Sequence, residues 1–354
     1  MIEIDTMISK TAGWLEGRGP ESEIVISSRV RLARNIEGYP FSHWATEDEA
    51  KKLLELIEKA IRKAASIKKY LFIRFENLTE IERQILHERH LISREHAEGK
   101  ENRAVAISPD EQVSIMVNEE DHLRIQVLFS GFQMSNASSL VNKIDDFLEK
   151  HLGYAYSSRY GYLTACPTNV GTGIRASVMM HLPGLVMIRQ IDQVLQAVGK
   201  LGLAVRGWYG EGSEVSGNLF QVSNQLTLGR TEDEIVEKLE KIIKQIIEHE
   251  RNARKMLLKK ELPLIQDRIG RAFGVLKYSH QITSSETMNL LSVLRAGIEL
   301  GILKGVDLKV VNELFLLTQP AHVQKIIGKK LNQKDRDEKR ADLIRKILRD
   351  EHLD

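Results

Sequence analysis

Alternating apolar and polar positions predict β-strands in the first two-thirds of the chain. Val113, Ile115 and Val117 alternate with other residues, and the same period of two resumes at Ile125 and Val127. This period is typical of a strand with one buried face. Further strands are predicted at 23–35, 70–75 and 103–108, and on both sides of a glycine-rich loop within 203–226.

Apolar positions three or four residues apart predict helices elsewhere. Thr46 with Glu49, and Thr231 with Glu234, have the spacing of capping boxes at helix starts. The apolar stripes that follow are Leu53, Leu54, Ile57 and Ile61 in the first helix, and Ile235, Leu239, Ile242 and Ile246 in the second. Helices are also predicted near 139–152 and over 187–201.

These patterns divide the chain into three parts. A short polar leader covers 1–23, a unit of strands and helices covers 24–259, and a charged segment without strand signals covers 260–354. Pro263 follows the long second helix, which places the boundary near Lys259. The last part is predicted to be entirely helical.

Composition and charge narrow the class of protein. The chain has 354 residues, of which 42% are hydrophobic and 28% charged, with a net charge of +2. This balance is that of a globular protein and favours neither a nucleic-acid partner nor a membrane partner. One cysteine, no signal peptide and no apolar run of membrane-spanning length lead us to expect a cytoplasmic protein.

Five arginines beside loops and turns suggest a phosphate site. A single arginine on a strand is usually a solvated surface group. Together, however, they favour polyphosphate binding, because the guanidinium fork grips phosphate oxygens in pairs. These residues are Arg29, Arg31, Arg124, Arg175 and Arg206. The phosphate-binding loop, protein-kinase and serine-hydrolase motifs are absent from the sequence.

Three adjacent carboxylates, Glu119–Asp121, interrupt the strand pattern. A solvated turn is the ordinary interpretation. A metal site is a second one, although no other acidic cluster has ligand spacing to support it. A third is a base that orients a cationic substrate, with Glu211 as a second carboxylate. Cys166, which enters a glycine loop, is either a buried small hydrophobe or a thiolate favoured by nearby N–H groups and cations.

Four segments together resemble the guanidino-phosphotransferase (phosphagen kinase) family. They are SSRVRLAR, VNEEDHLR, CPTNVGTGIRAS and RGWYGEGSEV, in that order. The resemblance implies an α+β fold, with an antiparallel sheet flanked by helices and followed by an all-helical C-terminal domain. Kinases of small guanidines carry a helical domain before the first segment and nothing like the C-terminal part. The chain is therefore most similar to the bacterial protein-arginine kinases (McsB type).

The resemblance also implies roles for individual residues. Glu120 matches the catalytic glutamate, Glu211 a second substrate-clamping glutamate, and Cys166 a cysteine that polarises the guanidinium. ATP would be bound by the five arginines and by His90. Mg²⁺ would be held mainly by the nucleotide, without protein ligands of its own, and Glu119 and Asp121 would reach it through water.

A short motif in the C-terminal part has two interpretations. Arg336 and Arg340 are one turn apart, with Asp337 and Ala341 beside them, and composition alone favours a solvated helix face. In the protein-arginine kinases this motif binds phosphoarginine as allosteric feedback, and the domain is linked to dimerisation. The resemblance therefore implies an allosteric phosphoarginine site in a homodimer.

The predicted activity is ATP-dependent phosphorylation of arginine side chains in proteins. Implied partners are protein substrates including a heat-shock repressor, a zinc-containing activator, and the Clp ATPase–protease that degrades marked proteins during stress. The alternatives are a phosphagen kinase acting on free arginine or another small guanidine, and a catalytically idle scaffold. Direct nucleic-acid binding has little support from the net charge.

Overall fold

The computed structural model describes residues 4–63, 67, 69–99, 101–209 and 216–349. Eight of the strands form one antiparallel sheet in the order β2-β3-β4-β5-β1-β8-β10-β9. Their bounds are β1 Val25–Arg34, β2 Leu71–Arg74, β3 Ala104–Ile107, β4 Val113–Val117, β5 Leu123–Ser130, β8 Ile174–His181, β9 Leu203–Arg206 and β10 Leu219–Asn224. A separate hairpin pairs β6 (Tyr156–Ser157) with β7 (Gly161–Tyr162).

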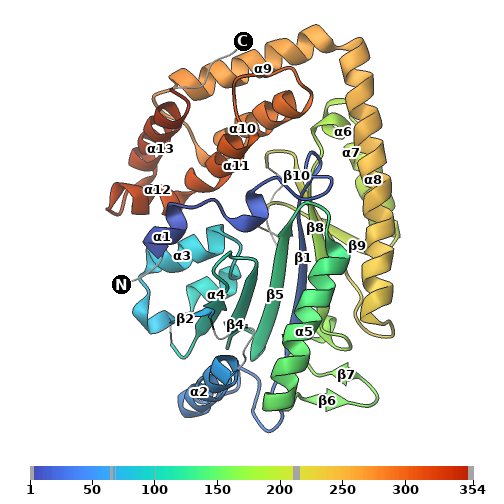
Figure 1. The fold of residues 1–354 in the computed structure, drawn as a ribbon, viewed down its shortest axis with the longest axis vertical. Coiled ribbons are helices and arrows are strands. Elements are labelled where there is room, and N and C mark those ends of the chain that lie inside the picture. Colours follow the sequence, from blue (N-terminus) through green and yellow to red (C-terminus); the bar gives the residue numbers. More distant parts are fainter. Residues whose placement is uncertain (1–3, 64–66, 68, 100, 210–215, 350–354) are drawn as a thin grey trace.

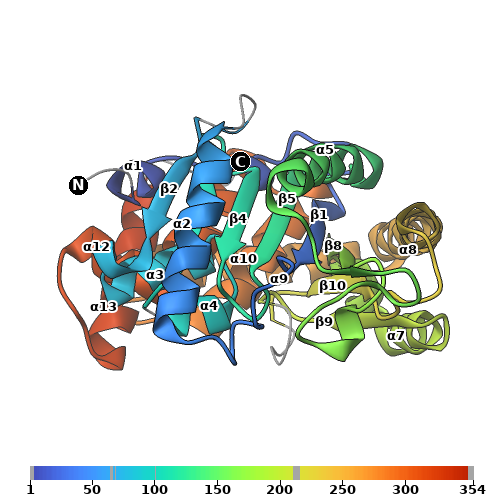
Figure 2. The same ribbon diagram turned by 90° about the horizontal axis from the view of Figure 1, so that it is seen from below.

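Helices cover one face of this sheet (Figures 1 and 2). They are α2 (Glu47–Lys63), α5 (Met134–Leu152), α7 (Ile191–Lys200) and α8 (Glu232–Lys260). Alternate strand residues such as Val30, Ile125 and Val178 form the main core with the apolar stripes of these helices. The capping boxes at Thr46 and Thr231 are both formed, so the predicted starts of α2 and α8 are confirmed.

The opposite face of the sheet is covered only in parts. The helices α3 (Glu80–Glu88) and α4 (Arg94–Glu98) pack on β3 and β4. The C-terminal helices pack on another part and lie across the upper end of the molecule in Figure 1. They are α9 Leu262–Tyr278, α10 Ser284–Glu299, α11 Leu308–Leu317, α12 Pro320–Ile327 and α13 Gln333–Ile347. An open cavity between these two covered regions exposes the middle strands.

The structure departs from the expected elements in three places. The helix predicted over 187–201 is present only as α7 (Ile191–Lys200). A short α6 (Pro183–Met187) ends before Arg189, which has a positive φ of 58° and separates the two helices. The helix expected near 139–152 starts five residues earlier, as α5. The polar leader also packs firmly, since α1 (Ile4–Ile8) precedes a 3₁₀ turn whose Trp14 is 2% exposed.

The helical C-terminal part contains no strand in the portion of the chain that the structure describes, as expected. The predicted domain boundary at Lys259 lies one residue before the end of α8. None of the described helices combines the length and the apolar character that crossing a bilayer requires.

Candidate active site

Strand β1 carries three arginines that face two different environments. Arg34 points to the helix side, where its guanidinium lies 2.7 Å from the Asp145 carboxylate and 3.3 Å from that of Glu232. These carboxylates raise the pKa of Arg34 although it is buried. Arg29 and Arg31 project from the other face, as the strand period predicts. No carboxylate of the described residues lies within ion-pair distance of either.

The sheet register brings further cations next to these two. Arg31 pairs across the ladder with Arg175 of β8, and Arg124 of β5 pairs with the neighbouring Ala33. Directly opposed like charges destabilise a sheet. Such a placement therefore indicates that an anion completes the site when it binds.

Burial and mutual repulsion change the electrostatics of these guanidinium groups. Desolvation, together with the charges of Arg175, Arg124 and Arg206, lowers the pKa of Arg29 to about 10. Desolvation and the charges of Arg29, Arg124 and Arg175 also lower the pKa of Arg31. Because arginine keeps its proton at neutral pH even so, these groups repel one another, and a bound polyphosphate would supply a counter-charge.

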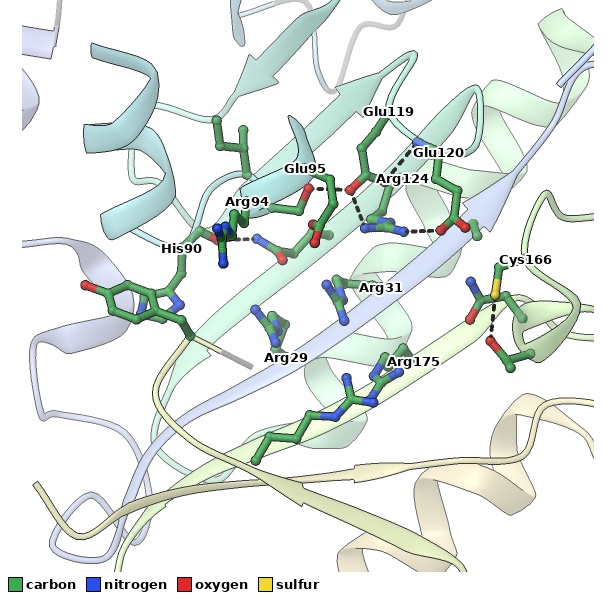
Figure 3. Close-up of a pocket in the computed structure, with 18 of the residues that line it drawn as sticks. Arg29, Arg31, His90, Arg94, Glu95, Glu119, Glu120, Arg124, Cys166 and Arg175 are labelled. Atoms are coloured by element: carbon green, nitrogen blue, oxygen red, sulfur yellow. Dashed lines mark hydrogen bonds and ion pairs between the residues drawn. The ribbon is translucent and has the colours of Figure 1, made fainter. Parts of the chain in front are cut away.

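These arginines line a cavity of about 780 Å³, the size of a small-molecule site. Figure 3 shows Arg29, Arg31 and Arg175 between His90 at one end of the cavity and Cys166 at the other. Side-chain hydroxyls hold two of these arginines: Arg29 donates to Ser177 at 3.3 Å, and Arg175 to Ser223 at 3.2 Å.

The turn between β4 and β5 places its three carboxylates in three environments. Glu119 is buried, forms an ion pair with Arg124 at 2.6 Å, and accepts a hydrogen bond from Ser93. Burial alone would raise the pKa of Glu119. Arg124 and Ser93 outweigh this effect, so the pKa of Glu119 is lowered. Glu119 therefore orients Arg124 towards the cavity, which is a positioning role.

Asp121 is fully buried and joins two segments of the chain. Its Oδ1 accepts hydrogen bonds from the Asn35 amide and the Ala165 N–H, both at 2.7 Å. Ala165 precedes Cys166, so this carboxylate holds the cysteine loop against the acidic turn. Both Glu119 and Asp121 are buried, and their contact with Mg²⁺ through water stays a prediction.

Glu120 is the carboxylate that remains available. It lines the cavity, its side chain is 45% exposed, and its one ion pair, with Arg124, is long at 3.5 Å. Desolvation and the charge of Asp121, with smaller contributions from Glu119 and Glu95, raise its pKa. A partly exposed carboxylate with a raised pKa is suited to accept a proton.

Cys166 lines the same cavity at the start of a 3₁₀ turn, Pro167–Asn169. Its Sγ lies 3.0 Å from the Thr168 hydroxyl, and the residue is only partly buried, which excludes the buried-hydrophobe interpretation. The glycine loop that follows re-enters the sheet at Gly173, where φ is 66° and a Cβ would lie 2.6 Å from the Ala33 carbonyl oxygen. Glycine is therefore required there.

His90 closes the other end of the cavity within an aromatic group. Its ring lies edge-on to Trp14 and Trp208, at 5.0 and 4.9 Å, and is stacked 5.7 Å from Tyr209. Desolvation and the charge of Arg29 lower the pKa of His90, so its ring is neutral at physiological pH. Its buried Nε2 has no hydrogen-bond partner among the described residues.

The two remaining predicted residues come from the second glycine loop. Arg206 ends β9 and lines the cavity, so all five predicted arginines meet there. Glu211 lies outside the described residues. Within the described portion of the chain, no group of three or more His, Cys, Asp or Glu side chains could hold a metal ion.

Several residues of the site were missed from the sequence. Gln126 follows Arg124 on the same strand face, so the period of two alone would have found it. Ser93 caps the start of α4 and Glu95 lies within this helix, and no strand pattern connects α4 to the site. The cavity lining not predicted includes His87, Ser93, Arg94, Glu95, Gln126, Thr168, Asn169, Tyr209, Gln221 and Gln225.

Comparison with known proteins agrees with this geometry. A family model described as ATP:guanido phosphotransferase, C-terminal catalytic domain, matches residues 52–253, and one described as Protein-arginine kinase McsB C-terminal domain matches residues 263–353. The protein-arginine kinase of Halothermothrix orenii is 47% identical, covering 97% of this chain and 98% of that one. That of Desulforamulus reducens is 49% identical, covering 97% of both.

The chain belongs to the protein-arginine kinase family. Solved phosphagen kinases share its catalytic fold. A duplicated taurocyamine kinase from Schistosoma mansoni is 25% identical with a TM-score of 0.61, and the match covers 69% of this chain and 35% of that one. This chain thus matches about a third of the length of that kinase. A lombricine kinase matches with a TM-score of 0.58, 24% identity and 70% coverage of both chains.

The C-terminal motif of the protein-arginine kinases lies on α13, and the structure excludes a solvated helix face. Arg340 is 1% exposed and donates to the carbonyl oxygens of Thr318 and Ile282, at 2.7 and 2.9 Å, and to Asp337. Ala341 is buried in the helical core. Arg336, which donates to the Leu331 carbonyl at 2.9 Å, is the more accessible arginine. Phosphoarginine binding there stays a prediction.

Proposed function

We propose that this protein transfers the γ-phosphoryl group of ATP to arginine side chains of other proteins. Membership of the family makes it a phosphotransferase that acts on a guanidino group. The observation that supports the assignment most directly is one cavity lined by Arg29, Arg31 and Arg175 together with Glu120 and Cys166. The cations suit the donor phosphates, and the carboxylate suits a guanidinium acceptor.

The arginines act through position and charge. Phosphoryl transfer needs little covalent help, and most of its catalysis comes from alignment and stabilisation of negative charge. Arg124 is already oriented by Glu119, and Arg29 and Arg175 by serine hydroxyls. Because these groups are held before ATP arrives, little reorganisation is needed when charge develops on the transferred phosphoryl group.

Glu120 prepares the acceptor. A guanidinium is protonated at neutral pH and is a poor nucleophile until a base takes a proton from the attacking nitrogen. The raised pKa of Glu120 makes it a better proton acceptor than an ordinary carboxylate. The partly exposed Cys166 thiol lines the same cavity, where it would contact the guanidinium and help to polarise it.

Mg²⁺ would be bound through the nucleotide. Two carboxylates of the acidic turn, Glu119 and Asp121, are buried and have partners within the chain, and no cluster of the described residues has metal-ligand composition. A hydrated Mg²⁺ is commonly held by phosphates and water, where it neutralises phosphate charge.

Transfer of labelled γ-phosphate tests this function. The acceptors are an arginine-containing protein and free arginine in parallel, and acid lability of the product identifies a P–N bond. Label on the protein is expected, with turnover reduced about 10²–10⁴-fold in Glu120→Gln. The matched control is Glu98→Gln, an exposed glutamate of α4 that is paired with Arg94 and does not line the cavity.

Other outcomes favour other functions. Label on free arginine alone would make the protein a phosphagen kinase for a small guanidine. No label on either acceptor, with ATP still bound, would favour an idle scaffold. Equal activity in Glu120→Gln and wild type would remove Glu120 from the mechanism.

The wider role remains a proposal based on the family. It comprises phosphorylation of a heat-shock repressor, activation by a zinc-containing protein, marking of substrates for the Clp ATPase–protease, a cytoplasmic location and a homodimer. Degradation of an arginine-phosphorylated protein by the Clp ATPase–protease, compared with the unmodified protein, tests the marking role. Light scattering at several concentrations tests the dimer.

A further inference from the structure

The loop of residues 37–46, between β1 and α2, carries an aromatic cluster made of the exposed His43 and Trp44 and the half-buried Phe41. Trp44 is 71% exposed, and its ring centroid lies 4.6 Å from that of His43 and 5.9 Å from that of Phe41. Figure 1 shows this loop at the lower end of the molecule, between α2 and β6.

The rings are ordered by the loop itself and not by the interior. The Trp44 and Ala45 N–H groups donate to the Phe41 carbonyl oxygen at 2.8 and 3.0 Å, forming a turn that brings the rings together. None of the three side chains contributes to the hydrophobic cores of the described chain. A large aromatic group that stabilises no core and faces solvent is typical of an interaction surface.

Hydrogen bonds attach this loop to one end of the acidic turn, and the helix α2 that follows the loop to the other end. The Pro40 carbonyl oxygen accepts from His122 Nε2 at 2.8 Å, and the Ala50 carbonyl oxygen accepts from the Asn118 amide at 3.0 Å. The Ile36 N–H donates to Nδ1 of the same histidine, which fixes the neutral ring with its proton on Nε2. Because Asn118 and His122 flank Glu119–Asp121, the aromatic cluster is anchored next to Glu120.

We propose that the aromatic cluster binds an apolar side chain that flanks the target arginine in the substrate polypeptide. This proposal rests on the proposed function. A peptide whose arginine reaches Glu120 must run over the rim of the cavity, and each extended residue spans about 3.3 Å, so residues that flank the arginine reach the adjoining surface. The loop that carries the cluster is attached to the acidic turn through the hydrogen bond between Pro40 and His122.

The charges near the aromatic cluster restrict which residues can flank the target arginine in the substrate. The first turn of α2, which begins three residues after Trp44, adds the exposed carboxylates Glu47 and Asp48. Acidic flanking residues would be repelled there. The surface therefore favours an apolar, non-acidic segment on one side of the arginine.

The test uses two synthetic peptides with one arginine each, one flanked by phenylalanines on both sides and one by serines. For Trp44→Ala, kcat/KM for the phenylalanine peptide should fall about tenfold, which corresponds to about 1.4 kcal/mol. kcat/KM for the serine peptide and the KM for ATP should not change. Trp44→Phe should retain most of the preference because it keeps an aromatic ring.

The matched control is Tyr278→Ala, which removes a 72% exposed aromatic residue of α9 outside the cavity lining. It should leave both peptides unaffected. Equal loss for both peptides in Trp44→Ala, or no loss for either, would overturn the docking surface while leaving the kinase assignment intact. If the wild-type protein phosphorylated neither peptide nor any protein acceptor, the proposed function itself would fail, and the docking surface with it.

Discussion

The hydrogen bonds of Asp121 allow a quantitative comparison between two substitutions. Both bonds, from the Asn35 amide and from the Ala165 N–H, end on Oδ1, while the buried Oδ2 has no partner among the described residues. Asp121→Ala removes the acceptor and leaves two buried donors unpaired. Each unpaired donor costs about 1–3 kcal/mol, so the free energy of unfolding should fall by about 2–6 kcal/mol.

Asp121→Asn should behave very differently. Its Oδ1 can keep both hydrogen bonds, so the Asn35 amide and the Ala165 N–H stay paired, and the free energy of unfolding should fall less than in Asp121→Ala. The change also removes a negative charge that raises the pKa of Glu120. Because a catalytic base is lost as the pH falls through its pKa, the acid limb of the kcat profile should move to lower pH.

Urea unfolding monitored by fluorescence measures the first effect, and labelled phosphate transfer between pH 5 and 9 measures the second. Asp121→Ala should also lower kcat, because the Cys166 loop loses its attachment to the acidic turn. Equal stability loss in both variants would refute the assignment of both hydrogen bonds to one oxygen. An unmoved acid limb in Asp121→Asn would refute the electrostatic link to Glu120.

Three further predictions concern other parts of the molecule. Arg31→Met should abolish ATP binding measured by calorimetry. In the absence of nucleotide, the same variant should have a free energy of unfolding about 1 kcal/mol higher than wild type, because it relieves repulsion between buried cations. A variant that is less stable than wild type would contradict this. Glu95→Gln should lower the pKa of Glu120 and so move the acid limb of the kcat profile to lower pH. An unchanged acid limb would show that the charge of Glu95 does not affect the pKa of Glu120. Arg340→Ala should lose about 3–5 kcal/mol of unfolding free energy, because it leaves Asp337 buried without its partner. Phosphoarginine binding is therefore better tested by calorimetry with Arg336→Ala, where unchanged affinity would argue against the predicted site.

The sequence by itself determined the elements whose signals are local. Strand alternation placed Arg29 and Arg31 on one face, and the capping boxes at Thr46 and Thr231 marked helix starts, because these features depend on neighbours within a few residues. The motif resemblance predicted roles for Glu120 and Cys166, and both residues line the same cavity. The helix break at Arg189 had no such signal, since the apolar spacing over 187–201 fits one continuous helix.

Only the tertiary structure decided which polar residues act in the site and which support it. Arg34 and Arg31 are three residues apart on one strand, yet the first has carboxylate partners and the second faces other guanidinium groups. Similarly, Glu119, Glu120 and Asp121 are consecutive, but only Glu120 is available to a substrate. Burial and the identity of partners distant in the chain determine pKa and accessibility, and these depend on how the strands pair and not on the local sequence.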